Sequence, residues 1–278
     1  MDLLKTIAAM RHFRKSASGK RIALVPTMGA LHAGHLALME AARKQAETVV
    51  VSVFVNPTQF GPTEDFARYP RDLAADTAKC ESVGVSAVFA PESSEMYSNE
   101  ASTTVKVAGV TEGLCGASRP IHFAGVATIV SKLFNIVAPD VAIFGQKDYQ
   151  QLVTIRRLVT DLDFPVEIVA HPTVREPDGL AMSSRNAYLS PDDRRAAPRI
   201  FASLQSVRAI FRAGERRQSQ LQRTLVEALH EVTDFQVEYA EIREQDSLRA
   251  VERPSRPIAL VAGRLGQTRL IDNLALDE

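Results

Sequence analysis

The chain has 278 residues, of which 45% are hydrophobic and 24% are charged, a balance typical of folded globular proteins. Lys plus Arg and Asp plus Glu number 33 each, so no basic excess favours a nucleic-acid or membrane-surface partner. Cys80 and Cys115 form no metal-binding or disulfide pattern, which favours a reducing compartment. We therefore expect a cytoplasmic protein that binds neither nucleic acid nor membranes.

An amphipathic helix is predicted at the N-terminus, because Leu3, Leu4, Ile7 and Met10 fall on one helical face. The basic character of this region also allows a transit peptide, but the apolar face and the strand that follows favour a folded helix. Residues 22–39 carry no charge, yet Pro, Gly and His interrupt the run, so a membrane span is not expected.

Strands and helices then alternate over the first two thirds of the chain. Apolar, β-branched runs predict strands at 21–26, 48–55, 86–91, 141–145 and 166–172. Helical spacing of apolar residues predicts helices at 35–46, 71–83, 125–137 and 148–162. This alternation predicts an α/β fold, with a Rossmann-like parallel sheet that carries helices on both faces. Such sheets bind ligands beyond the carboxyl ends of their strands.

The pattern changes after about residue 175. Ser190, followed by Pro and two acids, predicts a helix start, and Pro198 predicts a kink. Another helix is expected at about 218–231, and three short antiparallel strands are expected at 235–244, 257–266 and 268–276. Turn residues at 174–178 mark a boundary. We therefore predict two domains, a Rossmann-like domain at 1–174 and a smaller C-terminal α+β domain at 175–278.

The segment "PTMGALHAGH" (26–35) lies between the first buried strand and a helix. Helix starts bind anions through free N–H groups, and Gly29 and Gly34 allow a phosphate to approach the backbone. His32 and His35 share one face of the first helical turn and can donate hydrogen bonds to developing charge. A surface histidine pair in a turn is the alternative, but the strand, glycine loop and histidine pair together favour a phosphate site.

Three other polar segments follow predicted strands or the boundary. "NPTQ" (56–59) offers amides that suit a substrate with hydroxyls and a carboxylate, or else a structural loop amide. "GQKD" (145–148) offers a lysine for phosphate and an acid for ribose or for orienting that lysine, with Gln151 one turn further on. "AMSSRN" (181–186) is a polar loop that could wrap a triphosphate, or an ordinary turn.

These segments together resemble the pantoate–β-alanine ligase family. "HAGH" resembles the HxGH signature of the nucleotidylyltransferase superfamily, which includes the class I aminoacyl-tRNA synthetases, and "MSSR" resembles its phosphate-binding loop. The resemblance covers nearly the whole chain, through "VSVFVNPTQF", "FGQKDYQQ" and "REPDGLAMSSRN". One departure is Ile121 in "RPIHF", where the family usually has glycine, which leaves the loop at 113–123 open.

The resemblance implies an ATP- and Mg²⁺-dependent ligase that joins pantoate to β-alanine through a pantoyl adenylate. It implies His35 as proton donor and His32 as its partner, with Lys147 and Arg185 as further catalytic residues. It implies a homodimer and a C-terminal domain that closes as a lid over the labile intermediate. For pantoate it implies Gln59 and Gln151, with Gln59 also near β-alanine; Asn56, in the same polar segment as Gln59, is a further candidate for the substrate. The residues implied for ATP are Met28, Gly29, Ala30, Leu31, His32, Ala33, Gly34, His35, Gly145, Gln146, Lys147, Asp148, Val174, Met182, Ser183, Ser184 and Arg185.

Several alternatives stay open at this point. A transferase that leaves the adenylyl group on its product shares the HxGH element, and only the released AMP would distinguish a ligase from it. A tRNA synthetase relative is disfavoured by the missing basic surface signal, and a non-enzymatic nucleotide binder would not need both histidines. Arg119 and His122 are candidates on a loop over the site, Asp72 is the candidate metal ligand, and His171 and His230 are interpreted as structural.

Overall fold

The computed structural model describes residues 1–62 and 64–278 and divides into two compact units. The first unit comprises Met1–Gln146 and Thr154–Pro172, and the second comprises Lys147–Val153 and Thr173–Glu278. Residues 147–153 and 173–174, which the sequence prediction assigned to the first domain, thus group with the C-terminal part. Within the described residues, no helix is both long and apolar enough to cross a membrane.

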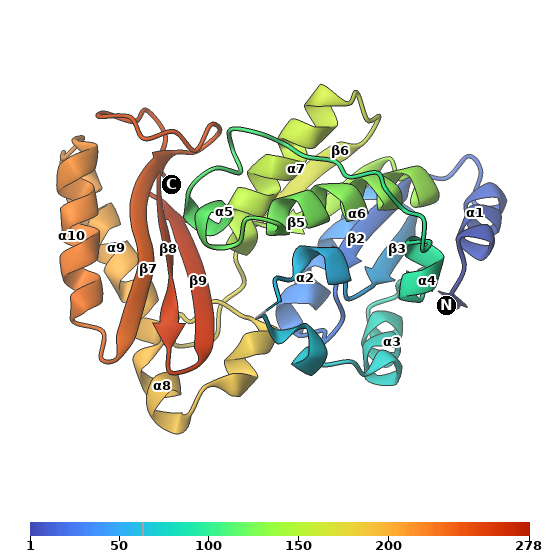
Figure 1. Ribbon diagram of the computed structural model, residues 1–278, viewed down its shortest axis with the longest axis horizontal. Helices are drawn as coiled ribbons and strands as arrows, with labels where there is room; N and C mark the ends of the chain where they lie inside the picture. Colours follow the sequence, from blue (N-terminus) through green and yellow to red (C-terminus); the bar gives the residue numbers. More distant parts are fainter. Residues whose placement is uncertain (63) are drawn as a thin grey trace. The chain divides into compact units, whose positions relative to one another are not determined.

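The first unit is built on a six-stranded, all-parallel sheet with the order β1-β4-β3-β2-β5-β6 (Figure 1). The strands are β1 Asp2–Leu4, β2 Ile22–Thr27, β3 Thr48–Val53, β4 Ala87–Phe89, β5 Val141–Gly145 and β6 Glu167–His171. Side chains on opposite faces of β2 are both fully buried, as shown by Ala23 and Val25 on one face and Ile22 and Leu24 on the other. The predicted parallel α/β sheet, covered on both faces, is therefore confirmed.

Helices and short 3-10 turns connect these strands. The helices are α1 Ile7–Ser16, α2 Ala33–Gln45, α3 Leu73–Ser82, α4 Ser93–Met96, α5 Leu114–Ser118, α6 His122–Val137 and α7 Tyr149–Asp161. The 3-10 turns are η1 Pro57–Gln59, η2 Asp65–Arg68 and η3 Gln146–Asp148. Apolar side chains of α2 and α3, such as Met39 and Cys80, pack with β2 and β3 in one buried cluster.

The N-terminal prediction was partly wrong. Leu3 and Leu4 belong to strand β1, which pairs with β4 in the register Leu3↔Val88 and Leu4↔Phe89. The helix begins only at Ile7, after Thr6 caps it by accepting the N–H of Ala9 at 3.1 Å. The outer edge of β4 takes up these residues, a non-local pairing that helical spacing in the sequence cannot reveal.

The order of the strands reverses beside β2. The chain runs from β2 through β3 to β4 on one side of the sheet and then returns to β5 and β6 on the other. Parallel sheets bind ligands where the order reverses, at the carboxyl ends of the strands. The segment after Thr27 and the segment after Gly145, at the ends of β2 and β5, therefore lie at the switch point.

The second unit contains a three-stranded antiparallel sheet in the order β7-β8-β9, with α9 and α10 against one face (Figure 1). Its elements are η4 Ser184–Tyr188, α8 Pro191–Ala196, α9 Pro198–Arg212, α10 Gln218–His230, β7 Phe235–Glu244, β8 Pro257–Leu265 and β9 Thr268–Ala275. Ser190 caps α8 by accepting the N–H of Asp193 at 3.1 Å, and the helix is interrupted before Pro198. The predicted start and kink are thus confirmed.

A buried ion pair fastens the start of the loop after β6 to strand β9. Both outer nitrogens of Arg175 donate to Asp272, at 2.7 and 2.9 Å, and the guanidinium lies 3.6 Å from the ring centroid of Phe201. Burial raises the pKa of Asp272, and the hydrogen bonds and charge of Arg175 oppose that rise. The guanidinium therefore offsets the cost of burying the Asp272 carboxylate. The ion pair attaches the start of the loop at 174–186 to strand β9.

Candidate active site

Two histidines cap helix α2 by exchanging hydrogen bonds with its first turn. The N–H of Gly34 donates to Nδ1 of His32 at 3.2 Å, and the N–H of His32 donates to Nδ1 of His35 at 3.3 Å. The two rings lie 4.0 Å apart, centroid to centroid. Because both Nδ1 atoms accept, each neutral ring carries its proton on Nε2. The helix start therefore presents two imidazole N–H donors.

Four further backbone N–H groups of the same loop have protein partners. The N–H of Gly29 donates to Oγ1 of Thr27 at 3.2 Å, and the N–H of His35 donates to the carbonyl of His32 at 2.8 Å. The N–H groups of Ala30 and Leu31 donate to the carboxylate of Asp76, at 2.9 and 2.8 Å. These four amides therefore have protein acceptors in this structure. The hypothesis that backbone N–H groups of this loop bind a phosphate stays a prediction.

Asp76 is a site residue that sequence reasoning missed. It belongs to α3, is 2% exposed, and holds a loop in which Gly29 and Ala30 both have left-handed backbones, with φ of +81° and +51°. Lys79, one turn further along α3, donates to the carbonyl of Leu31 at 2.7 Å. The signal was present in the sequence, because Asp76 falls on the buried face of its helix, one turn before Cys80, where an apolar residue would be expected.

Gln59 and Asn56 form a buried amide network after β3. Asn56 is 1% exposed, and its Nδ2 donates to Oε1 of Gln59 and to the carbonyl of Gly125, both at 3.1 Å. Its Oδ1 accepts from the hydroxyls of Thr58 and Tyr97, at 3.0 and 2.8 Å. Asn56 thus holds Gln59 and accepts a hydrogen bond from Tyr97, a residue that the sequence did not suggest. The assignment of Asn56 to the substrate stays a prediction.

The Gln59 side chain points toward the segment after β2. Its Nε2 lies 2.9 Å from the sulfur of Met28, and Gln59 is 7% exposed. The segment 28–35, which carries His32 and His35, is called the histidine loop below. In the first unit, the structure thus brings Met28 of this loop together with Gln59, whose side-chain amide the resemblance assigns to pantoate. The candidate pantoate residue is therefore in place beside the candidate ATP loop.

Helix α6 supports η1 through a close backbone contact. A Cβ atom on Gly125 would lie 2.4 Å from the carbonyl oxygen of Thr58, so only glycine fits. His122, 9% exposed, places Nδ1 3.0 Å from the carbonyl of Gln59. Ile121 has φ of −95° and an exposed side chain, so the departure from the family's glycine requires no unusual backbone.

Arg119 and Glu64 form a two-pronged ion pair over η1. Nε and Nη2 of Arg119 donate to the two carboxylate oxygens of Glu64 at 2.6 and 2.8 Å, and Nη2 also donates to the carbonyl of Gln59 at 3.4 Å. Burial acts to raise the pKa of Glu64, but the hydrogen bonds and charge of Arg119 outweigh it, so the pKa is lowered. Arg119 and His122, predicted to lie over the site, therefore hold the backbone of Gln59.

The candidates that follow β5 sit in a tight turn. Gly145 ends β5, Gln146 begins η3, and Gln151 lies in the first turn of α7. Nζ of Lys147 lies 3.5 Å from the carboxylate of Asp148, which fits the suggestion that Asp148 orients the lysine. In the second unit, Nδ2 of Asn273 donates to the carbonyl of Lys147 at 2.8 Å, so strand β9 helps to fix this turn.

The loop at 174–186 is a short hairpin followed by η4. The N–H of Met182 donates to the carbonyl of Val174 at 2.9 Å, and Arg175 pairs with Ala181. Ser183 caps η4 by accepting the N–H of Arg185 at 3.2 Å. Within the second unit, the structure thus places Val174 beside Met182, the residue directly before the serine–arginine segment of Ser183, Ser184 and Arg185.

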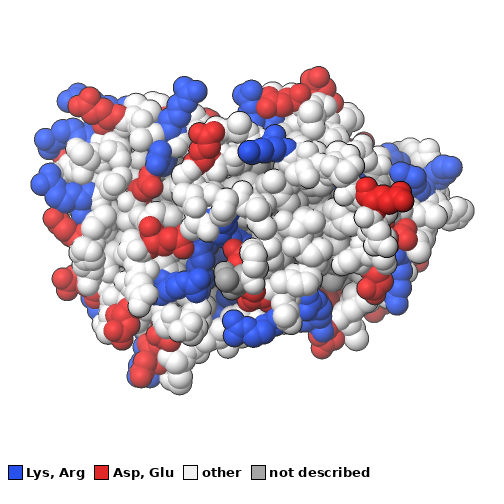
Figure 2. All heavy atoms as spheres, viewed as in Figure 1, with Lys and Arg blue, Asp and Glu red and all other residues white. Residues whose placement is uncertain are grey.

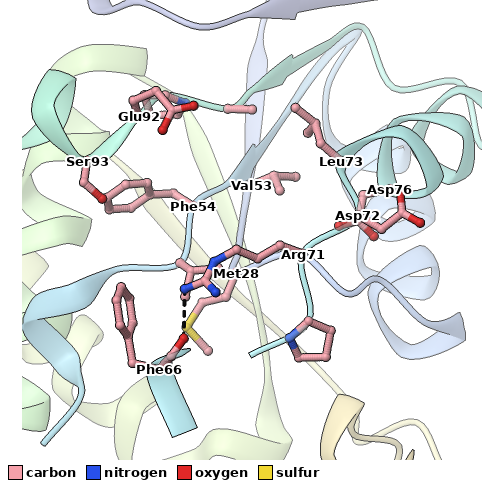
Figure 3. Close-up of a pocket in the computed structure, with 15 residues that line it drawn as sticks. Met28, Val53, Phe54, Phe66, Arg71, Asp72, Leu73, Asp76, Glu92 and Ser93 are labelled. Carbon is pink, nitrogen blue, oxygen red and sulfur yellow. Dashed lines mark hydrogen bonds between the residues drawn. The ribbon is translucent and has the colours of Figure 1, made fainter. Parts of the chain in front are cut away.

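A cavity of about 210 Å³ opens beside the histidine loop, at the carboxyl ends of β2, β3 and β4 (Figure 3). Met28 and Gly29 line it, together with the carboxylates of Asp72, Asp76 and Glu92. Figure 3 shows Glu92 across the cavity from Asp72 and Asp76.

This cavity does not provide a protein-only metal site. Both oxygens of Asp76 accept loop N–H groups, and Oδ1 of Asp72 accepts the N–H of Ala75 at 2.9 Å. Across residues 1–62 and 64–278, no three His, Cys, Asp or Glu side chains are arranged to hold a metal ion. Mg²⁺ usually keeps several waters and binds through one or two carboxylates plus substrate phosphates, a mode that does not need three such side chains.

The two histidines interpreted as structural belong to other elements. His171 ends β6, where its backbone pairs with Gly145 and its Nδ1 lies 2.8 Å from the carbonyl of Pro172. His230 is the last residue of α10 in the second unit.

Replacing Glu64 with Gln should make the free energy of unfolding less dependent on pH in the acidic range. A lowered folded pKa means that the pair stabilises the protein above the ordinary value of 4.5 and that this stabilisation is lost as pH falls through the lowered value. E64Q should lower the free energy of unfolding by about 1–2 kcal/mol near neutral pH, measured by urea denaturation, because it removes a charge-assisted pair. The difference from wild type should shrink below about pH 4. Glu81→Gln, an exposed carboxylate of α3, is the control; a difference for E64Q that is equally large in acid would contradict the assignment.

Comparison with known proteins gives a consistent result over the full length. The profile of the family described as pantoate–β-alanine ligase matches residues 2–275. The chain is 52% identical over 280 residues to the pantothenate synthetase of Moorella thermoacetica, covering 100% of this chain and 99% of that relative. It is 53% identical over 280 residues to the pantothenate synthetase of Paramagnetospirillum magneticum, covering 100% of this chain and 98% of the relative.

Solved structures agree with the sequence relatives. The crystal structure of pantothenate synthetase from Thermus thermophilus superposes with a TM-score of 0.95 at 47% identity, covering 99% of both chains. That of the pantoate–β-alanine ligase from Francisella tularensis, complexed with "Beta-gamma ATP" and β-alanine, superposes with a TM-score of 0.82 at 30% identity, covering 100% of this chain and 98% of the other. With the profile matched from residue 2 to residue 275, the chain belongs to the pantoate–β-alanine ligase family.

Proposed function

We propose that the protein condenses (R)-pantoate with β-alanine, using ATP, to give pantothenate, AMP and diphosphate. The observation that carries the proposal is the pair of histidines whose Nδ1 atoms cap the start of α2, in a loop whose Met28 contacts the buried amide of Gln59. Such a pair suits a reaction in which negative charge develops on phosphate oxygens next to a bound hydroxy acid.

In the first step, a pantoate carboxylate oxygen attacks the α-phosphorus of ATP. The bond between the α-phosphorus and the bridging oxygen breaks, diphosphate leaves with its electron pair, and pantoyl adenylate remains. His35 and His32 donate their Nε2 hydrogens to the phosphate oxygens that gain charge, and Lys147 and Arg185 add positive charge. These donors do not need to form a covalent bond, so the enzyme acts by positioning and charge stabilisation.

In the second step, the neutral amine of β-alanine attacks the acyl carbon of the adenylate. An amide bond forms, the acyl–oxygen bond to AMP breaks, and the proton lost by the amine is released. Gln59 and Gln151 hold pantoate through both steps, with Gln59 close to the incoming amine. Asn56, by its contacts, serves to keep the Gln59 amide in one orientation.

Mg²⁺ enters this scheme with the nucleotide. Since the described carboxylates supply no dedicated site, we expect phosphates and waters to hold the ion, where it neutralises charge on the triphosphate. The remaining ATP contacts are assigned to residues 28–35, 145–148, Val174 and 182–185.

The second unit is proposed to close over the nucleotide, because a labile acyl adenylate needs protection from water and Arg185 lies in that unit. The hairpin at 174–182 and η4 would form the closing edge. Limited proteolysis between 175 and 190 should be slower with ATP plus pantoate than without them. Equal cleavage in both conditions would argue against a closing lid.

We further expect a homodimer in the cytoplasm, with small molecules as the only substrates. Figure 2 shows acidic and basic side chains interspersed over the drawn face of each unit, a charge pattern that gives no support to nucleic-acid binding. Size-exclusion chromatography with in-line light scattering would measure the molar mass in solution, and the mass of a single chain would refute the dimer.

Isotope exchange between ATP and diphosphate tests the two-step chemistry. Pantoate alone should support exchange, because adenylate formation is reversible and does not involve β-alanine. Exchange that strictly requires β-alanine would refute the adenylate intermediate. Adding β-alanine should then release AMP in proportion to pantothenate, whereas an adenylylated product without AMP would identify the transferase alternative.

Changing His35 should slow turnover more than it weakens pantoate binding. His35→Ala removes a donor to charge that builds up mainly in the transition state, so kcat should fall about 100–1,000-fold, or about 2.7–4 kcal/mol. The KM for pantoate should change less, since Gln59 and Gln151 hold that substrate. His35→Gln keeps an oxygen that can accept the N–H of His32, as Gln does in capping boxes, and so separates the loss of the cap from the loss of the imidazole.

Gln151→Ala is the matched comparison for His35. It should raise the KM for pantoate while leaving exchange at saturating pantoate close to wild type. If His35→Gln turns over like the wild-type enzyme, the imidazole has only a structural role, whether or not His35→Ala folds.

A further inference from the structure

We propose that Asp76 and Lys79 of helix α3 are positioning residues that hold the histidine loop in the conformation in which His32 and His35 face the nucleotide. We call the contacts of Asp76 and Lys79 with residues 30 and 31 the clamp. The effect of the clamp on catalysis rests on the proposed function, whereas its effect on the conformation of the loop does not. Leu73 and Cys80 of α3 pack as apolar members of the neighbouring core cluster, so a buried carboxylate between them needs a reason.

The clamp binds both the N–H groups and a carbonyl group of one short segment, residues 30 and 31. The carboxylate of Asp76 accepts the N–H groups of Ala30 and Leu31, at 2.9 and 2.8 Å, and the ammonium of Lys79 donates to the carbonyl of Leu31 at 2.7 Å. Leu31 is thus held through its N–H and its C=O, immediately before the cap residue His32. Asp76 and Lys79 lie three residues apart, on one face of α3, so one rigid helix supplies both contacts.

The loop needs such a constraint because its backbone is unusual. Gly29 and Ala30 have φ of +81° and +51°, and a non-glycine residue adopts a left-handed backbone only when its surroundings impose it. Asp76 also explains why residue 29 is glycine, since a Cβ atom there would lie 2.9 Å from its carboxylate oxygen. Without Asp76 the loop would lose the acceptors that keep two consecutive peptide groups turned.

A carboxylate suits this position better than an amide or a metal ligand. Each of its oxygens faces one N–H donor, and an ionised carboxylate has only acceptors. An asparagine would direct its own NH₂ group at one of the two N–H groups, and a bound metal would compete for the same oxygens. The geometry therefore points to a device that orients backbone, in contact with the loop rather than with substrate.

The experiment compares Asp76→Asn and Lys79→Met with Lys79→Arg and Cys80→Ala. Lys79→Arg keeps a donor for Leu31. Cys80, fully buried on the same helix, has a pKa raised to about 11 by burial and by Asp76, so its neutral thiol contributes packing alone. Cys80→Ala therefore loosens α3 without removing a loop contact. Amide hydrogen exchange and pantoate-dependent ATP–diphosphate exchange are measured for each variant.

For Asp76→Asn we expect faster hydrogen exchange at the amides of residues 30 and 31 and a kcat lower by about 10–100-fold, as for catalytic groups displaced by about 1 Å. The KM for pantoate should change little, because Gln59 is held from the other side by Asn56. Lys79→Met should show a smaller loss of the same kind, and Lys79→Arg should recover it. Cys80→Ala should lower the melting temperature and keep its turnover.

Other outcomes would overturn the proposal. Unchanged exchange at residues 30 and 31 in Asp76→Asn would show that the carboxylate does not hold the loop. Faster exchange with wild-type turnover would show that the clamp does not position the histidines. An equal loss of turnover in Cys80→Ala would reduce the effect to helix stability. If Asp76→Asn fails to fold, the Lys79 pair decides, since that residue is exposed. A wild-type protein that makes no pantothenate would refute the proposed function while leaving the hydrogen-exchange test of the clamp intact.

Discussion

The reciprocal cap between His32 and His35 is the interaction on which the site depends. Each ring accepts a backbone N–H through Nδ1, so a helix start that would otherwise offer amide donors uses them on its own side chains. The ring donor is then Nε2–H, on an imidazole whose position is fixed by the helix. Protonating Nδ1 of either ring would remove an acceptor from the cap. The cap thereby assigns both Nδ1 atoms as acceptors and fixes the orientation of the two rings at the start of α2.

The same arrangement recurs around Gln59. His122 and Arg119 contact the backbone carbonyl of Gln59, and Asn56 donates to its side-chain amide oxygen. Arg119 is itself paired with Glu64. Gln59 is therefore fixed by groups that are themselves buried or ion-paired. Binding groups held this way lose little conformational entropy when a ligand arrives, which is the physical meaning of preorganisation. Gly125 completes the support, because its missing side chain lets α6 reach the backbone of η1.

Local patterns in the sequence were sufficient for the sheet, for most helices and for the segments that carry the resemblance. Strand alternation and apolar spacing are properties of consecutive residues, so β2, β3 and α2 could be predicted from them. Contacts between distant segments could not. Asp76 holds a loop more than forty residues earlier in the chain, Tyr97 reaches back to Asn56, and β1 exists only because the outer edge of β4 is there to pair with it. The acceptor of the Ala30 and Leu31 amides was missed for the same reason, since it lies on another helix.

The amide contacts of the loop bear on catalysis through the position of the histidines. An N–H donor raises turnover only if it binds the phosphate more strongly in the transition state than in bound ATP. Backbone amides and neutral imidazoles are both uncharged donors, so the attraction of either for phosphate increases as the oxygens gain negative charge during diphosphate departure. The size of that gain depends on how well the donor is held in place before the charge appears. Because Asp76 accepts the amides of Ala30 and Leu31, the peptide groups directly before His32 are fixed. The acceptor at Asp76 and the cap at His32 thus serve one end, a fixed position for the two imidazole rings.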